Sequence, residues 1–207
     1  MRQGLSLQQR AAGGFTLVEL VVTFAVLAIL TLLAAPSFTD WIRNTQVRSV
    51  ADAMQNGLRL AQAEAVRRSR LVVFSLTAGQ PGLNAAAVAN GANWSIQAVP
   101  VAGIDSANLQ FVQGGAFGDV ATGVTINGPA FICFNAEGRL AVGNTGLAGV
   151  ACAPPADGST IDYDVSRAAA QLRQGSDHPL RVRVALGGQV RMCDPAKTLS
   201  ATNPDGC

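Results

Sequence analysis

One carboxylate stands inside a long apolar run near the start of the sequence. Between Phe15 and Phe38 the only charged side chain is that of Glu19. An ionised side chain in the middle of a membrane costs roughly 2.5–3.5 kcal/mol even on a lenient insertion scale. A carboxylate paired with a cation is tolerated far better than one left alone. The position of Glu19 therefore predicts that another group pairs with it.

The cysteines are spaced for disulfides rather than for a metal. None of the four lies in a C-x-x-C pair, and His178 is the only histidine. Zinc sites use closely spaced cysteine or histidine pairs, so we expect no metal and no cofactor. Behind a membrane segment, this number of cysteines suits disulfides in an oxidising compartment. Three pairings are possible, and we favour the nearest neighbours, Cys133–Cys152 and Cys193–Cys207. Each would close a loop worth about 3 kcal/mol in the chain-entropy model.

Catalytic residues are lacking. The single histidine, with no G-x-S-x-G and no P-loop, leaves no nucleophile and base to combine. Asp162 and Asp164 share one face of a predicted strand, a spacing that is common on protein surfaces. We therefore expect that the protein is not an enzyme.

Charge is distributed unevenly along the chain. The formal net charge is +2, but the side chains of residues 39–70 sum to +3, those of 71–164 to −5 and those of 165–207 to +3. None of these blocks is a dense basic tract, so the pattern is typical of solvated surface.

The apolar run is long enough to cross a membrane. A helix of 24 residues would extend about 36 Å, and the hydrocarbon core is roughly 30 Å thick. Arg2 and Arg10 precede the run, and positively charged flanks remain cytoplasmic. The sequence thus predicts a cytoplasmic N-terminus with the rest of the chain on the other side.

A cleaved signal peptide is the competing interpretation, with a cut after Ala34-Ala35. The run is longer than the usual apolar core of such peptides, and Pro36 would directly follow the cut. A generic membrane anchor accounts for the length, but not for Gly14, Phe15 and Glu19 together.

The segment GFTLVEL, residues 14–20, resembles the processing site of type IV pilins and type II secretion pseudopilins. The resemblance implies that a prepilin peptidase cuts between Gly14 and Phe15 and methylates the new amino group. Glu19 would then be the fifth residue of the mature chain and would meet the amino terminus of a neighbouring subunit. Similar pilins also carry a proline at the place of Pro36, where the helix can bend or loosen.

A second helix pattern follows the apolar run. Residues 39–68 have apolar side chains at spacings of three and four, at Val47, Val50, Met54, Leu58, Ala61 and Ala65. This stripe predicts packing on a sheet; coiled-coil pairing is the alternative, but the stripe is short and ends in alanines. Gly57 allows close packing, and Arg67, Arg68 and Arg70 suit the negative end of the helix dipole.

Beyond Arg70 the pattern changes to short strands separated by turn residues. The predicted strands are 71–76, 94–99, 109–112, 123–127, 131–134, 139–142, 161–165, 181–186 and 189–193. A hairpin is expected at Gly187-Gly188, with Val182 and Val184 facing the core and Arg181 and Arg183 facing water. Residues 77–93 are expected to form a flexible, variable loop.

Two segments resemble the FimT/FimU/GspH branch of the family. They are FICFNAEGRLAV (131–142), with Asn135, Gly138 and Arg139 at its turn, and RMCDP (191–195). The expected fold is α+β, a long N-terminal helix packed on an antiparallel β-sheet head. The expected divisions are a leader at 1–14, a transmembrane helix at 15–38, an amphipathic helix at 39–70 and a β-rich periplasmic head at 71–207.

The resemblance implies a minor pilin that joins major and other minor pilins at the pilus tip and primes assembly. It would first be a single-pass protein of the bacterial inner membrane. A minor pseudopilin of the type II secretion system is the alternative. A third hypothesis is DNA capture, because some FimT-like members bind DNA through a Gly-Arg-x-Arg tail motif. Gln189 replaces the first arginine of that motif here, and the candidate DNA-binding residues are Arg181, Arg183, Arg191 and Lys197.

Overall fold

The computed structural model describes residues 14–101, 103, 108–145, 147, 150–155, 159–173 and 175–207, except for the side chains of Pro36 and Asn144. It divides into two compact units, Met1–Thr39 and Asp40–Cys207. Residues 1–13, the greater part of the predicted leader, lie outside the described residues.

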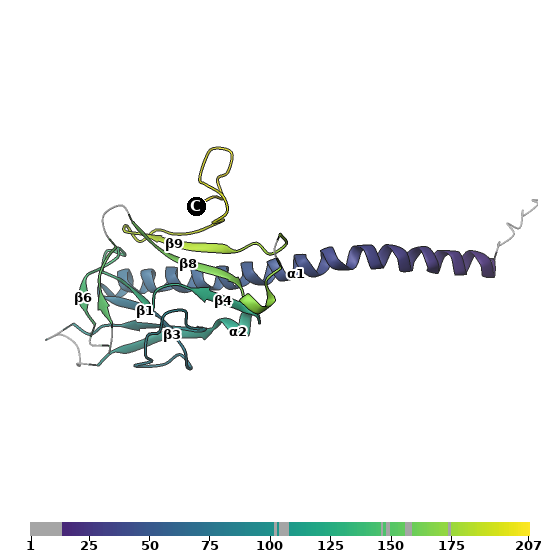
Figure 1. The fold of residues 1–207 in the computed structure, drawn as a ribbon. Helices are drawn as coiled ribbons and strands as arrows, with labels where there is room; N and C mark the ends of the chain where they lie inside the picture. Colours follow the sequence, from purple (N-terminus) through teal and green to yellow (C-terminus); the bar gives the residue numbers. More distant parts are fainter. Residues whose placement is uncertain are drawn as a thin grey trace, which may run out of the picture. The chain divides into compact units, whose positions relative to one another are not determined.

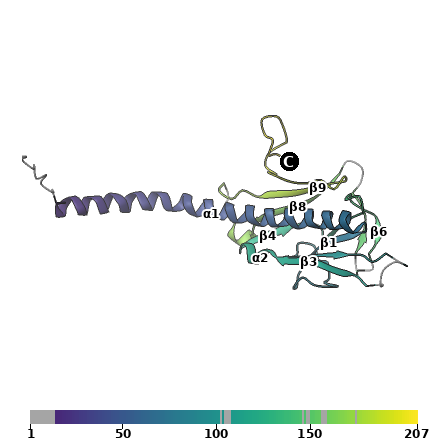
Figure 2. The ribbon, with the colours of Figure 1, turned by 180° about the vertical axis from the view of Figure 1, so that it is seen from behind.

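Helix α1 (Leu17–Arg68) is one unbroken element of 52 residues that passes through position 36. From Asp40 onward it lies across the strands of the head (Figure 2). The helix ends at Arg68 rather than at Arg70, because Ser69 takes a left-handed conformation with φ of 51°. The N–H of Arg70 then donates back to the carbonyl of Ala65 at 3.1 Å, a closure typical of helix C-termini.

Two four-stranded antiparallel sheets and a two-stranded ladder make up the head (Figure 1). The first sheet has the order β3 (Gln110–Ala116), β2 (Asn93–Ala98), β1 (Val72–Thr77), β5 (Phe131–Phe134). The second has the order β10 (Val190–Cys193), β9 (Leu180–Ala185), β8 (Thr160–Arg167), β4 (Val124–Asn127). The ladder pairs β6 (Gly143–Asn144) with β7 (Ala151–Cys152), and the short helices are α2 (Phe117–Val120) and a 3-10 turn (Ala169–Gln171). The predicted α+β architecture is confirmed.

The main core forms where α1 meets both sheets. The stripe predicted on α1 is fully buried, at 0–1% exposure from Val47 to Ala65, and it shares one cluster with Phe74 of β1 and Tyr163 of β8. A Cβ at Gly57 would lie 3.1 Å from the Phe74 ring, so glycine lets the helix approach β1 closely. The stripe thus packs on the head of its own chain.

One sequence prediction about the head was wrong. Residues 139–142 form no strand, because the pairing that follows the turn ends after an isolated bridge from Leu140 to Phe134 and one hydrogen bond from the N–H of Ala141 to the carbonyl of Cys133. Residues 78–92, within the loop predicted at 77–93, form no helix or named strand, but hydrogen bonds tie them to the strands. The N–H of Val88 donates to the carbonyl of Leu76, and the N–H of Asn84 donates to the buried side chain of Gln97 at 3.0 Å, which fastens the loop to the first sheet.

The expected hairpin joins β9 to β10, with Gly188 at φ 84°. A Cβ at Gly188 would lie 1.9 Å from the carbonyl oxygen of Gly138, so the hairpin tip packs directly on the turn of residues 135–139. In that turn the Asn135 side chain accepts from the N–H groups of Glu137 and Arg139, at 3.1 and 2.9 Å. Asparagine and glycine here shape the backbone.

Side chains of α1 occupy the outer edge of β10. The guanidinium of Arg59 donates to the carbonyl of Val190 at 3.3 Å. The Gln55 amide lies against the N–H of Met192, and its oxygen accepts from that N–H at 3.3 Å in the amide orientation that satisfies its hydrogen bonding. The edge of the second sheet is therefore covered by the helix of the same chain.

Candidate functional site

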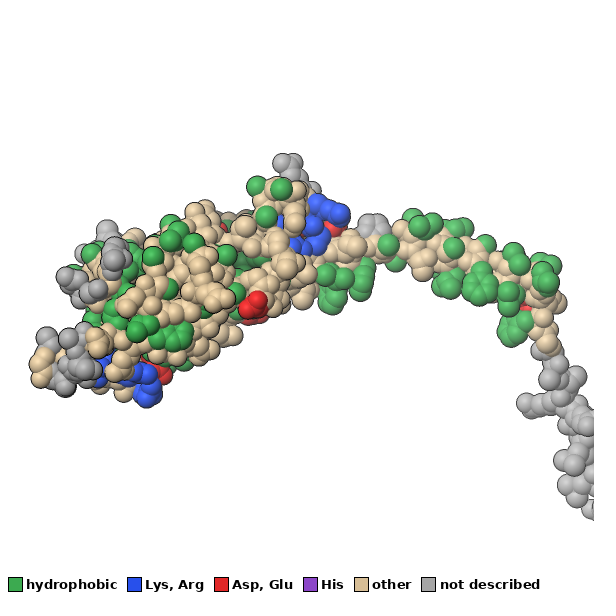
Figure 3. All heavy atoms as spheres, turned by 90° about the horizontal axis from the view of Figure 1, so that it is seen from below, with side chains coloured by type: hydrophobic (Ala, Val, Ile, Leu, Met, Phe, Trp, Pro, Cys, Tyr) green, Lys and Arg blue, Asp and Glu red, His purple; other side chains and the backbone are tan. Residues whose placement is uncertain are grey.

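The segment from Phe15 to Phe38 presents apolar side chains on its surface (Figure 3). Phe15 is 83% exposed, and even Val26, the least exposed of its large apolar side chains, is 51% exposed. The most apolar 18-residue stretch of α1 has a mean hydropathy of 2.6 and is long enough to cross a membrane. Within the described part of the chain, nothing covers this surface.

Glu19 lies in the first turn of that helix. Thr16 precedes the helix and accepts a hydrogen bond from the Glu19 N–H at 3.2 Å, which satisfies a backbone donor at the helix start. The Glu19 carboxylate makes no hydrogen bond or ion pair with any described residue. Gly14 and Phe15 are exposed beside it. An ionised carboxylate on an apolar helix is costly in a membrane unless a cation pairs with it.

Two of the candidate DNA-binding residues are bound in a cross-strand ion-pair ladder. Arg183 of β9 lies opposite Asp162 of β8 and binds it through two nitrogens at 2.8 and 2.9 Å. Arg181 binds Asp164 at 2.6 and 3.0 Å and reaches Asp162 at 3.3 Å. Hydrogen bonding by Arg183 lowers the pKa of Asp162. The two carboxylates lie against the two guanidinium groups and offset their charge.

The other two candidates hold the C-terminal loop. Arg191 donates to the carbonyl of Gly206. Lys197 pairs with Asp205 at 2.6 Å and with Asp194 at 3.4 Å. Four carboxylates therefore accompany the four candidate cations, and the patch expected from the sequence is close to neutral.

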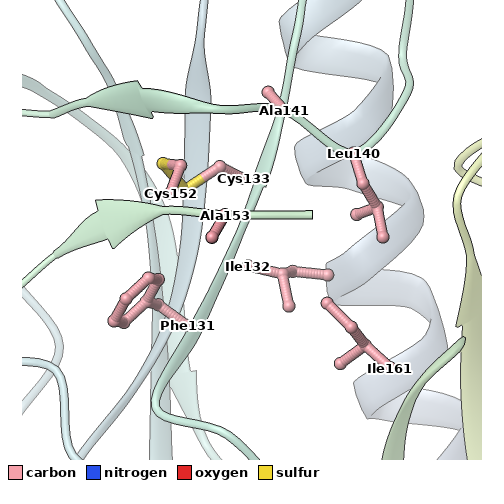
Figure 4. A pocket seen from close by; sticks show the side chains of 8 residues that line it. All are labelled: Phe131, Ile132, Cys133, Leu140, Ala141, Cys152, Ala153 and Ile161. Carbon is pink, nitrogen blue, oxygen red and sulfur yellow. A yellow bond between two sulfur atoms is a disulfide. The ribbon is translucent and has the colours of Figure 1, made fainter. Parts of the chain in front are cut away.

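The four cysteines form two disulfides, Cys133–Cys152 and Cys193–Cys207, which is the nearest-neighbour pairing expected from the sequence. The first links β5 to β7 (Figure 4). It borders a cavity of about 10 Å³, room for one water at most, so this place holds no ligand. The second closes the loop after β10, which projects beyond β9 in Figures 1 and 2.

A polar cluster that the sequence did not reveal joins the start of the head's helix to residues 171–178. Arg43 binds both carboxylate oxygens of Asp177, at 3.1 and 2.8 Å, and donates to the carbonyl of Gln171. The contact with Arg43 lowers the pKa of Asp177. Arg167 is buried beside this pair, donates to Gln46 and to the carbonyl of Thr122, and has its pKa lowered by burial. Partners 134 positions apart leave no local pattern by which to find them.

No group of three or more histidine, cysteine, aspartate or glutamate side chains that could hold a metal occurs among the described residues. The candidate residues described in the head make the ion pairs and turn contacts given above.

Two protein-family models match the chain, one at its N-terminal segment and one over most of the head. Residues 9–35 match the family model described as prokaryotic N-terminal methylation motif, and residues 50–188 match that described as type II transport protein GspH. Two fimbrial proteins of Pseudomonas aeruginosa are each 35% identical over 69 residues, 33% of this chain. The match spans 44% of those relatives, less than half of their length.

Among solved structures, the type IV minor pilin FimU of Pseudomonas aeruginosa aligns in two crystal forms. The first is 15% identical with a TM-score of 0.45, over 74% of this chain and 92% of that one. The second is 14% identical with a TM-score of 0.42, over 72% of this chain and 94% of that one.

Proposed function

The chain belongs to the GspH family of the pilins and pseudopilins and carries the N-terminal methylation motif of these structural proteins, and we propose that it is a minor type IV pilin. It would join other minor pilins in a complex at the pilus tip that primes assembly of the major pilin. The fimbrial relatives support a pilus as the destination.

One observation carries the proposal: an exposed apolar helix that bears a carboxylate with no partner among the residues that the structure describes. In the inner membrane, lipid covers the apolar side chains but leaves Glu19 unpaired. In a fibre, the helices of neighbouring subunits cover the same surface, and the methylated amino group of a neighbour's Phe15 supplies the cation. The pairing therefore favours the assembled state over the membrane state.

The processing step follows from the same segment. A prepilin peptidase cuts after Gly14 and methylates Phe15, and Gly14 and Phe15 are exposed as such a cut requires. The leader at 1–14 remains in the cytoplasm, residues 15–38 span the inner membrane, and residues 39–70 continue into the periplasmic head at 71–207. Pro36, near the end of the span, allows the helix to loosen on assembly.

Deleting the gene and measuring the major pilin sheared from the cell surface tests this function. We expect a large loss of surface pili, restored by the wild-type gene but not by Glu19→Ala. Glu137→Ala, which removes an exposed glutamate in the head, is the matched control and should restore pili fully. Incorporation of Glu19→Ala at the wild-type level would refute the pairing role.

The GspH match favours a second candidate, a minor pseudopilin of the type II secretion system. Surface pili would then be unchanged by the deletion, and secretion of the system's substrate proteins would be lost instead.

A further inference from the structure

A groove of about 230 Å³ opens on the head beside the first turns of its helix. Trp41, Asn44, Thr45 and Arg48 line it from a single helix face, since they are spaced by three, four and seven residues. His178 and Leu180, at the start of β9, form the opposite wall. All six residues belong to the unit Asp40–Cys207.

The walls of the groove are held in place. The Asn44 side chain donates to the carbonyl of Ser176 at 2.8 Å and accepts from the N–H of His178 at 2.9 Å. These two hydrogen bonds fasten the segment before β9 to α1, so the groove exists before any ligand arrives.

Arg48 supplies the charge of the groove. Nearby arginines have carboxylate partners, since Arg43 binds Asp177 and Arg173 binds Asp40. Arg48 is exposed and makes no hydrogen bond or ion pair within the described part of the chain, although Asp52 lies one helical turn further along. The groove thus offers an arginine with its donors available to an anion.

The covalent chain keeps the Trp41 end of this groove near the membrane surface. Trp41 follows Phe38 by three residues, so its Cα lies within about 11 Å of the end of the apolar run, whatever angle the head takes. The headgroup layer is roughly 5–7 Å thick on each side of the hydrocarbon core. Trp41 is 63% exposed, and tryptophan is enriched in this layer. Arg48 follows Trp41 on the same helix face, and long helical side chains lean back toward the N-terminus, here toward the membrane.

We propose that this groove binds the headgroup of an anionic phospholipid while the subunit is still in the inner membrane. The Arg48 guanidinium donates to the phosphate oxygens, a geometry that arginine provides in bidentate form. The Trp41 indole lies at the boundary between headgroups and acyl chains. The contact orients the head on the membrane and must be released when the subunit enters a fibre. This inference depends on the membrane anchoring in the proposed function, and not on whether the fibre is a pilus or a pseudopilus.

Tryptophan fluorescence of the full chain in lipid vesicles tests the proposal. The chain has two tryptophans, and Trp94 is buried, so Trp94→Phe leaves Trp41 as the only reporter. If Trp94→Phe does not fold, the difference between wild type and Trp41→Phe reports the same signal. The vesicles combine phosphatidylcholine with increasing phosphatidylglycerol brominated near the headgroup.

We expect quenching of Trp41 that rises with the phosphatidylglycerol content and weakens with salt. Arg48→Gln should raise the phosphatidylglycerol content needed for half-maximal quenching about fivefold, and Arg48→Lys should recover part of the loss. Arg139→Gln, an exposed arginine at the turn beside Gly138, is the matched control and should behave as wild type.

Three outcomes would overturn the proposal. Equal quenching of the wild type and Arg48→Gln would mean that the groove does not bind the headgroup. Displacement of the lipid signal by inorganic phosphate would identify a general anion site rather than a lipid contact. Unchanged quenching combined with fewer surface pili in Arg48→Gln would assign the groove to a neighbouring subunit. None of these results affects the Glu19 test, so the two proposals fail separately.

Discussion

Replacing Tyr163 by phenylalanine should stabilise the head, although the substitution removes a polar group from its centre. Tyr163 is 0% exposed, and its hydroxyl has no hydrogen-bond partner among the described residues. Its ring packs edge-to-face on Phe74 with centroids 6.4 Å apart, and Gly128 leaves room for the ring. Phenylalanine would keep both contacts and remove only the hydroxyl.

The size of the effect follows from the cost of burying that hydroxyl. An unsatisfied buried polar group costs about 1–3 kcal/mol. The small cavity left by the missing oxygen reduces that gain by a few tenths of a kcal/mol, at about 24 cal/mol per Å³ of cavity. We therefore expect a gain of about 1 kcal/mol, which corresponds to a rise of roughly 2–4 °C in Tm for a unit of this size. Urea unfolding of the full chain in detergent, followed by the fluorescence of buried Trp94, measures it.

The pH dependence supplies an independent readout. Burial raises the pKa of Tyr163 above its ordinary value near 10, so the folded state holds the phenolic proton more tightly than the unfolded state does. The stability that the folded protein owes to its protonated Tyr163 is fully present below about pH 10 and is lost as the pH rises further. Because Tyr163 is the only tyrosine, the absorbance of tyrosinate should appear only on unfolding.

Tyr163→Leu is the control that loses the ring as well, and it should destabilise the head. A loss of 1 kcal/mol or more in Tyr163→Phe would refute the reasoning, because it would mean that the hydroxyl makes a hydrogen bond in the folded protein. Titration of the tyrosine near pH 10 in the folded state would contradict its burial.

Three further predictions concern the ion pairs and disulfides of the head. Cys133→Ser with Cys152→Ser should lower the free energy of unfolding by about 3 kcal/mol, measured in urea without reductant; an unchanged midpoint would contradict it. Asp177→Asn should cost about 2 kcal/mol at pH 7 by breaking the contact with Arg43. Since the folded pKa of Asp177 is depressed, this stability is present above about pH 4 and disappears as the pH falls below it, so the two proteins should converge in acid. Duplex DNA should not be retarded by the protein at low salt, because carboxylates neutralise the candidate cations; retardation abolished by Arg191→Ala would restore the DNA hypothesis.

The helix and its buried face could be predicted because they follow from local periodicity. Apolar residues from Val47 to Ala65 recur on one face of a helix, and burial of that face against strands is the usual outcome. The turn between β9 and β10 could also be predicted from a local signal, because Gly188 supplies the left-handed conformation that the turn requires.

Contacts between distant segments could not be predicted in this way. The pair Arg43–Asp177 and the hydrogen bond from Asn84 to Gln97 each join a regular element to a polar, irregular segment, and such a segment has no periodicity from which its partner could be predicted. The alternation in β8 and β9 indicated which faces carry Asp162 and Arg183, but only the strand register places them opposite each other. The sequence alone therefore suggested a basic surface where the fold makes a neutral one.

Gln55 and Arg59 cover the edge of β10, and this affects how readily neighbouring heads could aggregate. An exposed strand edge is a template for pairing with another chain and leads to amyloid-like aggregation. In the proposed fibre, the heads would be held at high local concentration. On this edge the backbone groups of Val190 and Met192 are already bonded to the chain's own helix. Association along β10 is thereby disfavoured, so pairing of strand edges would not compete with the proposed assembly through the helices.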